Sequence, residues 1–465
     1  MRLAILGAGP GGYVAAIRAA QLGAQVTIIE EEEVGGTCLN KGCIPTKTII
    51  ASTNLLDKTR RLGEFGIESR GEIRPNLSAM LSRKDKVVRT QIKGIRNLFK
   101  SRGIQLKDGR GALTSSRTIL VSFRDGSQET IEADMIIIAT GSRPYSVAAF
   151  PFDGKRILSS TDLLKLTEIP KSLLIVGGGV IGCEFACIFA QLGTEVTVVE
   201  MLDRVLPTED AEISDVLERE FKKKKIKVYI NTKVEKIVSE EGGAHAFLHG
   251  EKEITADKVL VATGRAFNSA GIGLEAAGVA KGVCGEILVN NRMETNVPGV
   301  YAVGDVTGGL LLAHVASREG ITAVINALGA NSTMDYTAVP SAIFTSPETA
   351  SVGLREFQAV EKGIKIKTGH FPFRSLGKAH ALGEIEGLVK VISDAETDKV
   401  LGVHIIGPHA SLLIHEAALA VRKGLKTRDI AETIHAHPTL SEALMEAAAD
   451  VLGEALHVIR KETSE

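Results

Sequence analysis

The sequence contains no tryptophan, and only 4% of its 465 residues are aromatic. Its cores must therefore be built chiefly from aliphatic residues, and apolar residue types make up 44% of the chain. That share is too high for a disordered protein. At about 150 residues per domain, the length predicts roughly three domains and excludes a single small core.

Net charge is nearly absent as well, because 55 Lys and Arg residues oppose 56 Asp and Glu residues. No global field attracts nucleic acid or an anionic membrane, so an anionic ligand must be held locally. The basic run at residues 222–225 has no interleaved aromatics and follows Glu218 and Glu220, which favours a solvated helix face over a nucleic-acid patch.

Cysteine is also scarce. An odd count of five fits a reducing compartment better than a secreted disulfide scaffold, so we expect a cytoplasmic protein. Long apolar runs are missing too, because Glu184 and several glycines interrupt the best candidate, residues 173–193. Residues 1–6 lack the apolar core and cleavage site of a signal peptide and are expected to form a strand. We therefore predict no membrane segment.

An internal repeat organises the chain. Residues 4–30 align without a gap on residues 174–200, with 12 identities in 27 positions. Each copy has an apolar run, a Gly-x-Gly-x-x-Gly loop, an Ala-rich stretch of helical period, a second apolar run and a final glutamate. This pattern is typical of the βαβ start of a dinucleotide-binding fold.

The residue types in each loop suit a dinucleotide. The first glycine makes a tight turn, the second admits a pyrophosphate to the helix N-terminus, and the third lets the helix approach the strand. The glutamate can accept hydrogen bonds from a ribose. At the second site this carboxylate, followed by Met201, Leu202 and Asp203, would repel a 2′-phosphate, which favours NAD over NADP. The predicted residues are Gly7, Gly9, Gly12 and Glu30 in the first copy, and Gly177, Gly179, Gly182 and Glu200 in the second.

Directly after the first copy, Cys38 and Cys43 lie five residues apart in a segment of helical period. The spacing could bring the side chains near enough for a short disulfide of the labile type that exchanges with thiols. Zinc is the competing interpretation, but a structural zinc site needs four ligands and the sequence has no second pair of this kind. Cys183 and Cys187, one helical turn apart, are expected to be buried small hydrophobes, and we predict no metal.

The segment Gly-Gly-Thr-Cys-x4-Cys-Ile-Pro-Thr-Lys at residues 35–47, behind a dinucleotide loop, resembles the flavoprotein disulfide reductases and, within them, the dihydrolipoamide dehydrogenase family. The resemblance runs from residue 3 to the C-terminal region. It implies an α/β fold with two Rossmann-like domains, for FAD and NAD, and a C-terminal α+β dimerisation domain. It places an FAD-binding domain at 1–145, an NAD-binding domain at 146–265, a central region completing the FAD domain at 266–335, and an interface domain at 336–465.

The resemblance also implies tightly bound, non-covalent FAD at the first loop and NAD at the second. Two strand-like runs that end in Ala-Thr-Gly, at residues 136–141 and 259–264, would close these two regions. The expected FAD contacts are Gly7, Gly9, Gly12, Glu30, Gly36, Thr37, Lys47, Ala112, Thr140, Gly141, Ser142, Asp305, Leu312, Ala313 and His314. The expected NAD contacts are Gly177, Gly179, Val180, Ile181, Gly182, Glu200, Val234 and Gly264.

Near the C-terminus, His435-Ala436-His437-Pro438 precedes Glu442. This carboxylate could hold one imidazole nitrogen and leave the other to move a proton. The peptide bond before Pro438 is a candidate for the cis form. By resemblance, His437 is the base and Glu442 its partner, Cys43 faces the flavin, Cys38 exchanges with substrate, and Lys47 pairs with Glu184 near the flavin.

The function that the resemblance implies is oxidation of protein-bound dihydrolipoamide, with reduction of NAD, by a homodimer. The partner would be the lipoyl domain of a 2-oxo acid dehydrogenase complex or the carrier protein of glycine cleavage. The nearest alternative is a related NAD(P)H-dependent reductase of another low-molecular-weight disulfide. A non-catalytic complex subunit would need none of the expected catalytic residues. Lys41 replaces the apolar residue common in the family, and its charge either lowers a thiol pKa or faces solvent.

Overall fold

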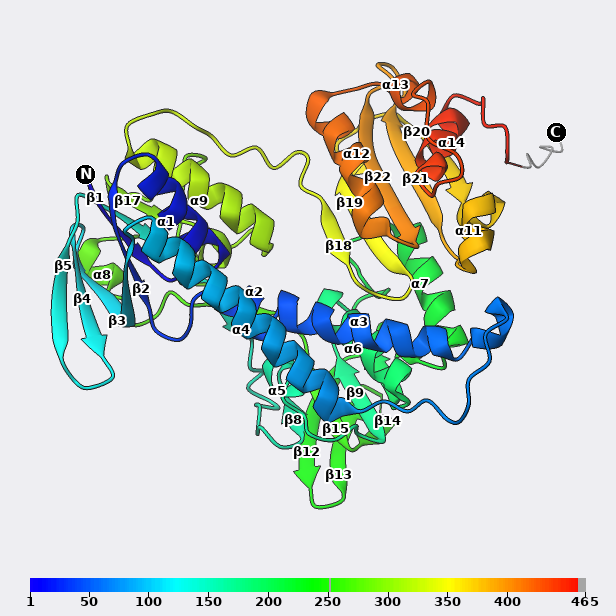
Figure 1. Ribbon diagram of the computed structural model, residues 1–465, viewed down its shortest axis with the longest axis horizontal. Coiled ribbons are helices and arrows are strands. Elements are labelled where there is room, and N and C mark those ends of the chain that lie inside the picture. The colour runs from blue at the N-terminus through cyan, green and yellow to red at the C-terminus, as the bar shows by residue number, and fades with distance from the viewer. Residues whose placement is uncertain (251, 459–465) are drawn as a thin grey trace.

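The two copies of the repeat begin two separate parallel sheets in the computed structural model, which describes residues 1–250 and 252–458. The register is the same in both copies, since Leu6 pairs with Ile29 and Val176 pairs with Val199. A further parallel strand borders each first strand on its other side. Figure 1 shows that these sheets lie in two different lobes and that a third lobe contains the C-terminal part of the chain.

The first lobe is built on a seven-stranded sheet that is discontinuous in sequence, because its edge strand comes after the whole second sheet. Its order is β17 (Val300–Ala302), β6 (Met135–Ile138), β1 (Arg2–Leu6), β2 (Gln25–Glu30), β3 (Gln105–Ser115), β4 (Thr118–Phe123) and β5 (Gln128–Glu132). The last three strands form an antiparallel meander. Helices α1 (Pro10–Gln21) and α9 (Ala313–Ala327) pack together against the sheet, and α8 (Leu274–Ala277) packs against β3.

The segment between β2 and β3 leaves the first lobe and returns. It contains α2 (Gly36–Lys41), α3 (Cys43–Thr59), the 3-10 turn η1 (Leu62–Phe65) and the long helix α4 (Leu77–Ser101). Figure 1 shows α3 and α4 crossing in front of the junction between the lobes. Apolar residues of α3, among them Ile49, Ile50 and Leu56, share a buried core with the second lobe.

The second lobe has a parallel sheet in the order β11 (Lys227–Tyr229), β10 (Glu195–Val199), β9 (Ser172–Val176), β15 (Lys258–Val261) and β8 (Ile157–Leu158). Its helices are α5 (Ser160–Leu163), α6 (Val180–Leu192) and α7 (Ala211–Lys223). An antiparallel sheet of β12 (Val234–Glu240), β13 (Gly243–Leu248) and β14 (Lys252–Ala256) packs beside it. Two short strands, β7 (Ser142–Pro144) and β16 (Arg265–Phe267), pair where the chain enters and leaves this lobe.

The third lobe is an antiparallel sheet in the order β18 (Ser341–Ile343), β19 (Glu348–Gly353), β22 (Val400–Gly407), β21 (Leu388–Asp394) and β20 (Ile366–Pro372). Its helices are α10 (Glu356–Glu361), α11 (Gly377–Leu382), α12 (Ala410–Lys423), α13 (Thr427–Ala431) and α14 (Glu442–Val451). The remaining 3-10 turns of the chain are η2 (Gly304–Thr307), which follows β17, and η3 (Phe373–Ser375).

The predicted fold class is confirmed: two parallel dinucleotide-type sheets are followed by a C-terminal α+β unit. The domain boundaries after residues 145, 265 and 335 stay predictions. Among the described residues, no helix combines the length and the apolar composition that crossing a bilayer requires.

Candidate active site

The cysteine pair lies at a break between two helices. The helical period of this segment is interrupted in the structure, because α2 ends at Lys41 and α3 begins at Cys43. Gly42 leaves the helical conformation between them, with φ −139° and ψ −109°. A Cβ at this position would lie 3.1 Å from the carbonyl oxygen of Thr37. Cys38 and Cys43 are both half-buried, and their sulfurs are not joined.

The two thiols have different acidities. A hydrogen bond from the Cys38 thiol lowers the pKa of Cys43 to about 7, and Lys47, four residues along α3, also lowers it, against burial and Glu184. The same hydrogen bond, together with burial, raises the pKa of Cys38 far above its usual value. Since the thiolate is the reactive form of cysteine, the reduced pair carries its negative charge on Cys43 near neutral pH.

Lys47 and Glu184 form an ion pair, as the resemblance implied. The Lys47 Nζ lies 2.8 Å and 2.9 Å from the two Glu184 carboxylate oxygens. Glu184 is almost fully buried on α6, and its Oε1 also accepts the backbone N–H of Phe344 at 3.0 Å. The ammonium lies 4.8 Å from the centroid of the Phe344 ring. Residues from all three lobes therefore fix the position of the helix that carries Cys43.

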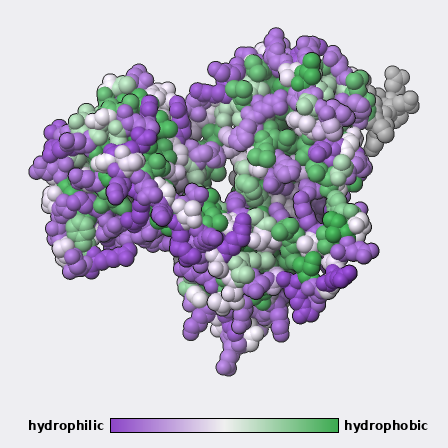
Figure 2. All heavy atoms as spheres, viewed as in Figure 1, coloured by the Kyte–Doolittle hydropathy of each residue, from purple (hydrophilic) through white to green (hydrophobic). Residues whose placement is uncertain are grey.

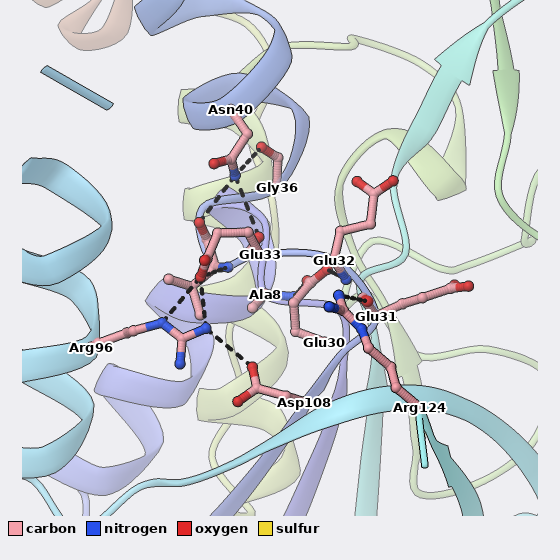
Figure 3. A network of polar contacts seen from close by, with 11 residues as sticks. Ala8, Glu30, Glu31, Glu32, Glu33, Gly36, Asn40, Arg96, Asp108 and Arg124 are labelled. Atoms are coloured by element: carbon pink, nitrogen blue, oxygen red, sulfur yellow. Dashed lines mark hydrogen bonds and ion pairs between the residues drawn. The ribbon is translucent and has the colours of Figure 1, made fainter. Parts of the chain in front are cut away.

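Polar contacts also fix the loop before α2, as Figure 3 shows. The Arg96 guanidinium on α4 donates to Glu33 Oε1 at 2.7 Å and 3.0 Å. The Asn40 side chain on α2 donates to three backbone carbonyls of the preceding segment, at 2.9–3.3 Å. Lys41 forms an ion pair with Glu32, so a surface carboxylate compensates its charge and the cation that acts on Cys43 is Lys47.

The first glycine loop fits a diphosphate. A Cβ on Gly12 would lie 1.9 Å from the carbonyl oxygen of Gly7, and a Cβ on Gly7 would lie 2.3 Å from that of Ala139. Gly9 differs, because only the Gly36 Cα, at 3.8 Å, comes within 4 Å of its Cβ position. The backbone is thus packed where strand and helix meet, and open at the N-terminus of α1, where free N–H groups favour an anion.

Glu30 and Glu200 are held by the same kind of backbone contacts in the two repeats. One carboxylate oxygen accepts the N–H of the glycine loop, from Ala8 at 2.7 Å and from Gly178 at 2.6 Å. The other oxygen accepts the N–H two residues farther on, at 2.8 Å in both copies. Each oxygen keeps a lone pair for a ribose hydroxyl, so both carboxylates fit a dinucleotide. Burial raises the pKa of Glu30.

The second loop opens into a cleft of about 1730 Å³ between the second and third lobes. A Cβ on Gly179 would meet no atom within 4 Å, whereas a Cβ on Gly182 would lie 1.9 Å from the carbonyl oxygen of Gly177. As in the first loop, the middle glycine has free space around it and the third glycine packs against the strand end, so this loop fits a second dinucleotide. The predicted NAD contacts that line the cleft are Gly177, Gly179, Val180, Ile181, Glu200, Val234 and Gly264.

Ser142 and Asp305, both expected at the FAD site, come together although 163 positions separate them. The Ser142 hydroxyl donates to the Asp305 carboxylate, and Arg265 donates to Ser142 Oγ at 2.6 Å and to its carbonyl oxygen at 2.8 Å. Burial lowers the pKa of Arg265, while Asp305 and Cys43 oppose this shift. Arg265 was not among the expected site residues, and its only signal in the sequence is its place directly after the second Ala-Thr-Gly motif.

The other expected FAD contacts come from several segments of the chain. Thr140 and Gly141 bond to the backbone of Asn268, with Thr140 Oγ1 donating at 2.8 Å. Thr37 Oγ1 donates to the Ser142 carbonyl oxygen at 3.4 Å. Leu312 and Ala313 are at the start of α9. His314 Nε2 donates to the Pro340 carbonyl oxygen at 2.9 Å. Ala112 is half-buried in β3.

His437 and Glu442 form the expected pair, with the imidazole Nδ1 2.9 Å from the carboxylate. The other carboxylate oxygen accepts the Thr439 N–H at 2.9 Å. Although burial opposes them, these contacts hold the pKa of Glu442 below its usual value. The His437 side chain is 78% exposed, which leaves Nε2 accessible, and the His437–Pro438 peptide is cis. The neighbouring His435 is buried against Glu416 instead.

One copy of the chain does not bring the histidine to the cysteines. Residues 435–442 belong to the third lobe and α2 belongs to the first, and Figure 1 shows them well apart. Within residues 1–250 and 252–458, no hydrogen bond or ion pair joins these two segments.

The comparisons with known proteins cover nearly the whole chain. The pyridine nucleotide-disulphide oxidoreductase model matches residues 1–320, and the dimerisation-domain model of the same group matches residues 339–448. The chain is 44% identical to dihydrolipoyl dehydrogenase of Chlamydia pneumoniae, covering 97% of each chain, and 43% identical to that of Thermus scotoductus, covering 99% of each. The crystal structure of LpdA from Mycobacterium tuberculosis matches with a TM-score of 0.91 at 33% identity, over 96% of this chain and 99% of that one.

These likenesses extend over the glycine loops, the cysteine pair and the C-terminal lobe. The chain therefore belongs to the pyridine nucleotide-disulphide oxidoreductase family, in the group of the dihydrolipoyl dehydrogenases.

Proposed function

We propose that this protein oxidises dihydrolipoamide to lipoamide and reduces NAD to NADH, by way of a Cys38–Cys43 disulfide and bound FAD. The observation that carries the proposal is the pair of close thiols with a thiolate-stabilising site at Cys43. This pair lies beside one open glycine loop, and a second open loop faces the large cleft. The full-length likeness to dihydrolipoyl dehydrogenases supports the same substrate.

The geometry supports FAD at the first loop and NAD at the second. The diphosphate of FAD would lie at Gly9, its ribose at Glu30 and its ribityl chain at Asp305. NAD would be held by Gly179 and Glu200. When bound, FAD supplies the two-electron transfer between the reduced cysteine pair and the nicotinamide. Glu200 disfavours a 2′-phosphate because it is almost fully buried at the cleft wall and has no cationic partner among the described residues.

The cysteines carry the first half of the reaction. His437 Nε2 takes the proton from one substrate thiol, and Glu442 holds Nδ1 and stabilises the imidazolium. The substrate thiolate attacks Cys38 Sγ, which breaks the Cys38–Cys43 bond and releases Cys43 as the thiolate that Lys47 stabilises. The second substrate sulfur then attacks the sulfur joined to Cys38, which closes the lipoamide ring and breaks the mixed disulfide. Cys38 leaves as the thiolate and takes the proton of this second substrate thiol. The dithiol loses two electrons, and the enzyme disulfide gains them.

A homodimer would complete the site. The third lobe matches a dimerisation domain, and one chain keeps His437 away from its own cysteines. We infer that His437 of one copy faces Cys38 of the other. The natural substrate would be a lipoyl group on a 2-oxo acid dehydrogenase complex or on the glycine cleavage carrier protein. The low cysteine count supports the cytoplasm, where the thiols stay reduced.

The test is turnover of dihydrolipoamide by the purified, FAD-loaded protein, with NADH formation as the readout. Cys38→Ser should lower this activity by about 1000-fold or more and leave the flavin spectrum intact, because the variant loses the attacked sulfur and no flavin contact. Cys284→Ser, at an exposed cysteine, is the matched control and should keep full activity. Full activity of Cys38→Ser would refute the assignment. Faster reduction of glutathione disulfide with NADH than turnover of dihydrolipoamide would favour the sister reductases.

A further inference from the structure

Helix α4 departs from the charge balance of the chain. It carries seven basic residues and a single acidic one, whereas the whole sequence has 55 against 56. Three of these basic side chains bond to neighbouring groups of the protein. The other four are exposed, and within residues 1–250 and 252–458 their side chains form no hydrogen bond or ion pair. They are Lys86, Arg89, Lys93 and Lys100, which we call the α4 stripe.

The stripe follows one face of the helix. Its members are three, four and seven residues apart, which at 100° per residue places them within about 60° of arc. At a rise of 1.5 Å per residue the stripe is about 21 Å long. Figure 2, drawn in the view of Figure 1 with α4 in front, shows mainly hydrophilic residues along this helix. The stripe is thus a row of four cations along one exposed face of the helix.

The opposite face of α4 packs against the segment with the cysteines. Ile95 and Phe99 are buried in one core with Leu39, the residue after Cys38. Arg96 is bonded to Glu33, whose backbone carbonyl accepts from Asn40 on α2 (Figure 3). The second half of α4 therefore packs on the loop and helix that present Cys38, the sulfur that the proposed reaction attacks, and the stripe lies on the outer face of the same helix.

Two cations on the helices next to α4 are compensated by carboxylates and do not extend the stripe. Lys41 pairs with Glu32, and on the far end of α3 Lys58 pairs with Glu384. On α4 itself, the acidic residue Asp85 lies 3.0 Å from Lys84 and is not part of the stripe. The stripe therefore keeps its positive charge, because no described carboxylate pairs with any of its four side chains.

We propose that the α4 stripe docks an acidic protein domain that carries the substrate dithiol, and so steers the dithiol to Cys38. The inference rests on the proposed dithiol oxidation and names the class of partner for that reaction. A free dihydrolipoamide is neutral and gains nothing from the stripe, whereas a carrier with surface carboxylates gains attraction and orientation. Nucleic acid is disfavoured because the helix has no exposed aromatic residue for base stacking. A bilayer is disfavoured because Ile95 and Phe99 face inward.

The experiment uses two synthetic peptides with one central dihydrolipoyl-lysine, flanked by glutamates in one and by glutamines in the other. For the FAD-loaded protein, we expect kcat/KM to be about tenfold higher for the glutamate peptide at low ionic strength. The ratio should approach one in about 0.5 M salt, where the Debye length is only a few ångströms. Lys86→Glu, Arg89→Glu and Lys93→Glu combined should invert the preference and leave turnover of free dihydrolipoamide unchanged.

A variant with Arg219→Glu, Lys222→Glu and Lys227→Glu is the control, because it makes the same change of net charge at exposed residues of the second lobe. It should keep the peptide preference of the wild type. An unchanged preference in the α4 variant would overturn the proposal, and so would an equal loss of activity towards free dihydrolipoamide. Monomers of the α4 variant in sedimentation would overturn it too, since the stripe would then be an interface between copies.

Binding separates this inference from the proposed function. Fluorescence anisotropy of the labelled, oxidised glutamate peptide needs no turnover. Loss of salt-sensitive binding in the α4 variant, but not in the control, supports docking even if the wild type oxidises no dithiol. Equal binding by both variants would refute docking even if dihydrolipoamide is a good substrate. Tighter binding of oligothymidine or of phosphatidylserine vesicles than of the peptide would assign the stripe to another partner.

Discussion

The contact between the second and third lobes depends on Lys390, and removing its charge should destabilise the protein strongly. Lys390 lies on β21 with 1% of its side chain exposed. Its Nζ lies 3.0 Å from Asp210 Oδ1, 2.7 Å from Glu212 Oε1 and 2.5 Å from Glu356 Oε2. The first two carboxylates flank the start of α7 in the second lobe, so one buried cation joins two lobes.

Lys390→Met keeps most of the side-chain volume and leaves the carboxylates without their cation. Glu212 and Glu356 are 42% and 47% exposed and can turn to water, but Asp210 is 2% exposed and cannot. Leaving one member of a buried ion pair uncompensated costs about 3–5 kcal/mol. For a cooperative unit of about 150–250 residues, each kcal/mol of lost stability lowers the melting temperature by about 2–4 °C, so the melting temperature should fall by roughly 10 °C.

Calorimetry of the FAD-loaded protein provides the measurement, and the second variant Lys390→Met/Asp210→Asn provides the control. The double variant should recover most of the loss, because the buried charge is gone. Although burial opposes it, His404 and Lys390 hold the pKa of Asp210 below its usual value. The stabilisation from the Asp210 carboxylate is present above the usual pKa of an aspartate and is lost as the pH falls. The difference in melting temperature between wild type and Lys390→Met should therefore shrink below about pH 4. A shift under 2 °C at neutral pH, or no recovery in the double variant, would refute this reasoning.

Three further predictions concern the active site. Gly179→Ala should raise the KM for NAD about tenfold without changing the melting temperature, because the added Cβ meets no protein atom but enters the expected phosphate position. Gly182→Ala should instead destabilise the second lobe, because its Cβ would clash with the carbonyl oxygen of Gly177. Equal stability of the two variants would contradict this. Lys47→Met should raise the pKa of Cys43 above about 7, measured from the pH dependence of thiolate absorbance in the reduced protein, and an unchanged titration would show that the ammonium does not act on this sulfur. Glu442→Gln should lower kcat about 100-fold because the imidazole loses its carboxylate, and an unaltered kcat would remove this pair from the mechanism.

Much of the fold and of the site follows from local sequence. The repeat at residues 4–30 and 174–200 predicts both parallel sheets, because glycine spacing and hydrophobic period are local properties of a βαβ unit. The cysteine pair and the His437–Glu442 pair can be predicted from the sequence for the same reason, because each joins residues only five positions apart. The break at Gly42 is not visible in the sequence pattern, because the helical period continues across it while the backbone leaves the helical conformation.

The resemblance, and not local pattern, supplied the pairing of Lys47 with Glu184, which are 137 positions apart. Other long-range contacts gave no signal before the structure was known. Arg265 reaches Ser142 through the pairing of β7 with β16, and Lys390 meets its carboxylates only when the second and third lobes dock. The α4 stripe is of the same kind, because the sequence shows the cations but only packing shows which helix face is free.

The sequence by itself determined the two glycine loops, the Cys38–Cys43 pair and the His437–Glu442 pair. Their chemistry depends on residue types at short spacing, which any fold of this class must keep. The tertiary structure alone decided which charges are buried together, which of the two thiols is the more acidic, and which cations of α4 stay exposed. Burial and electrostatic coupling arise between segments that are distant in sequence, so only the folded chain brings them together.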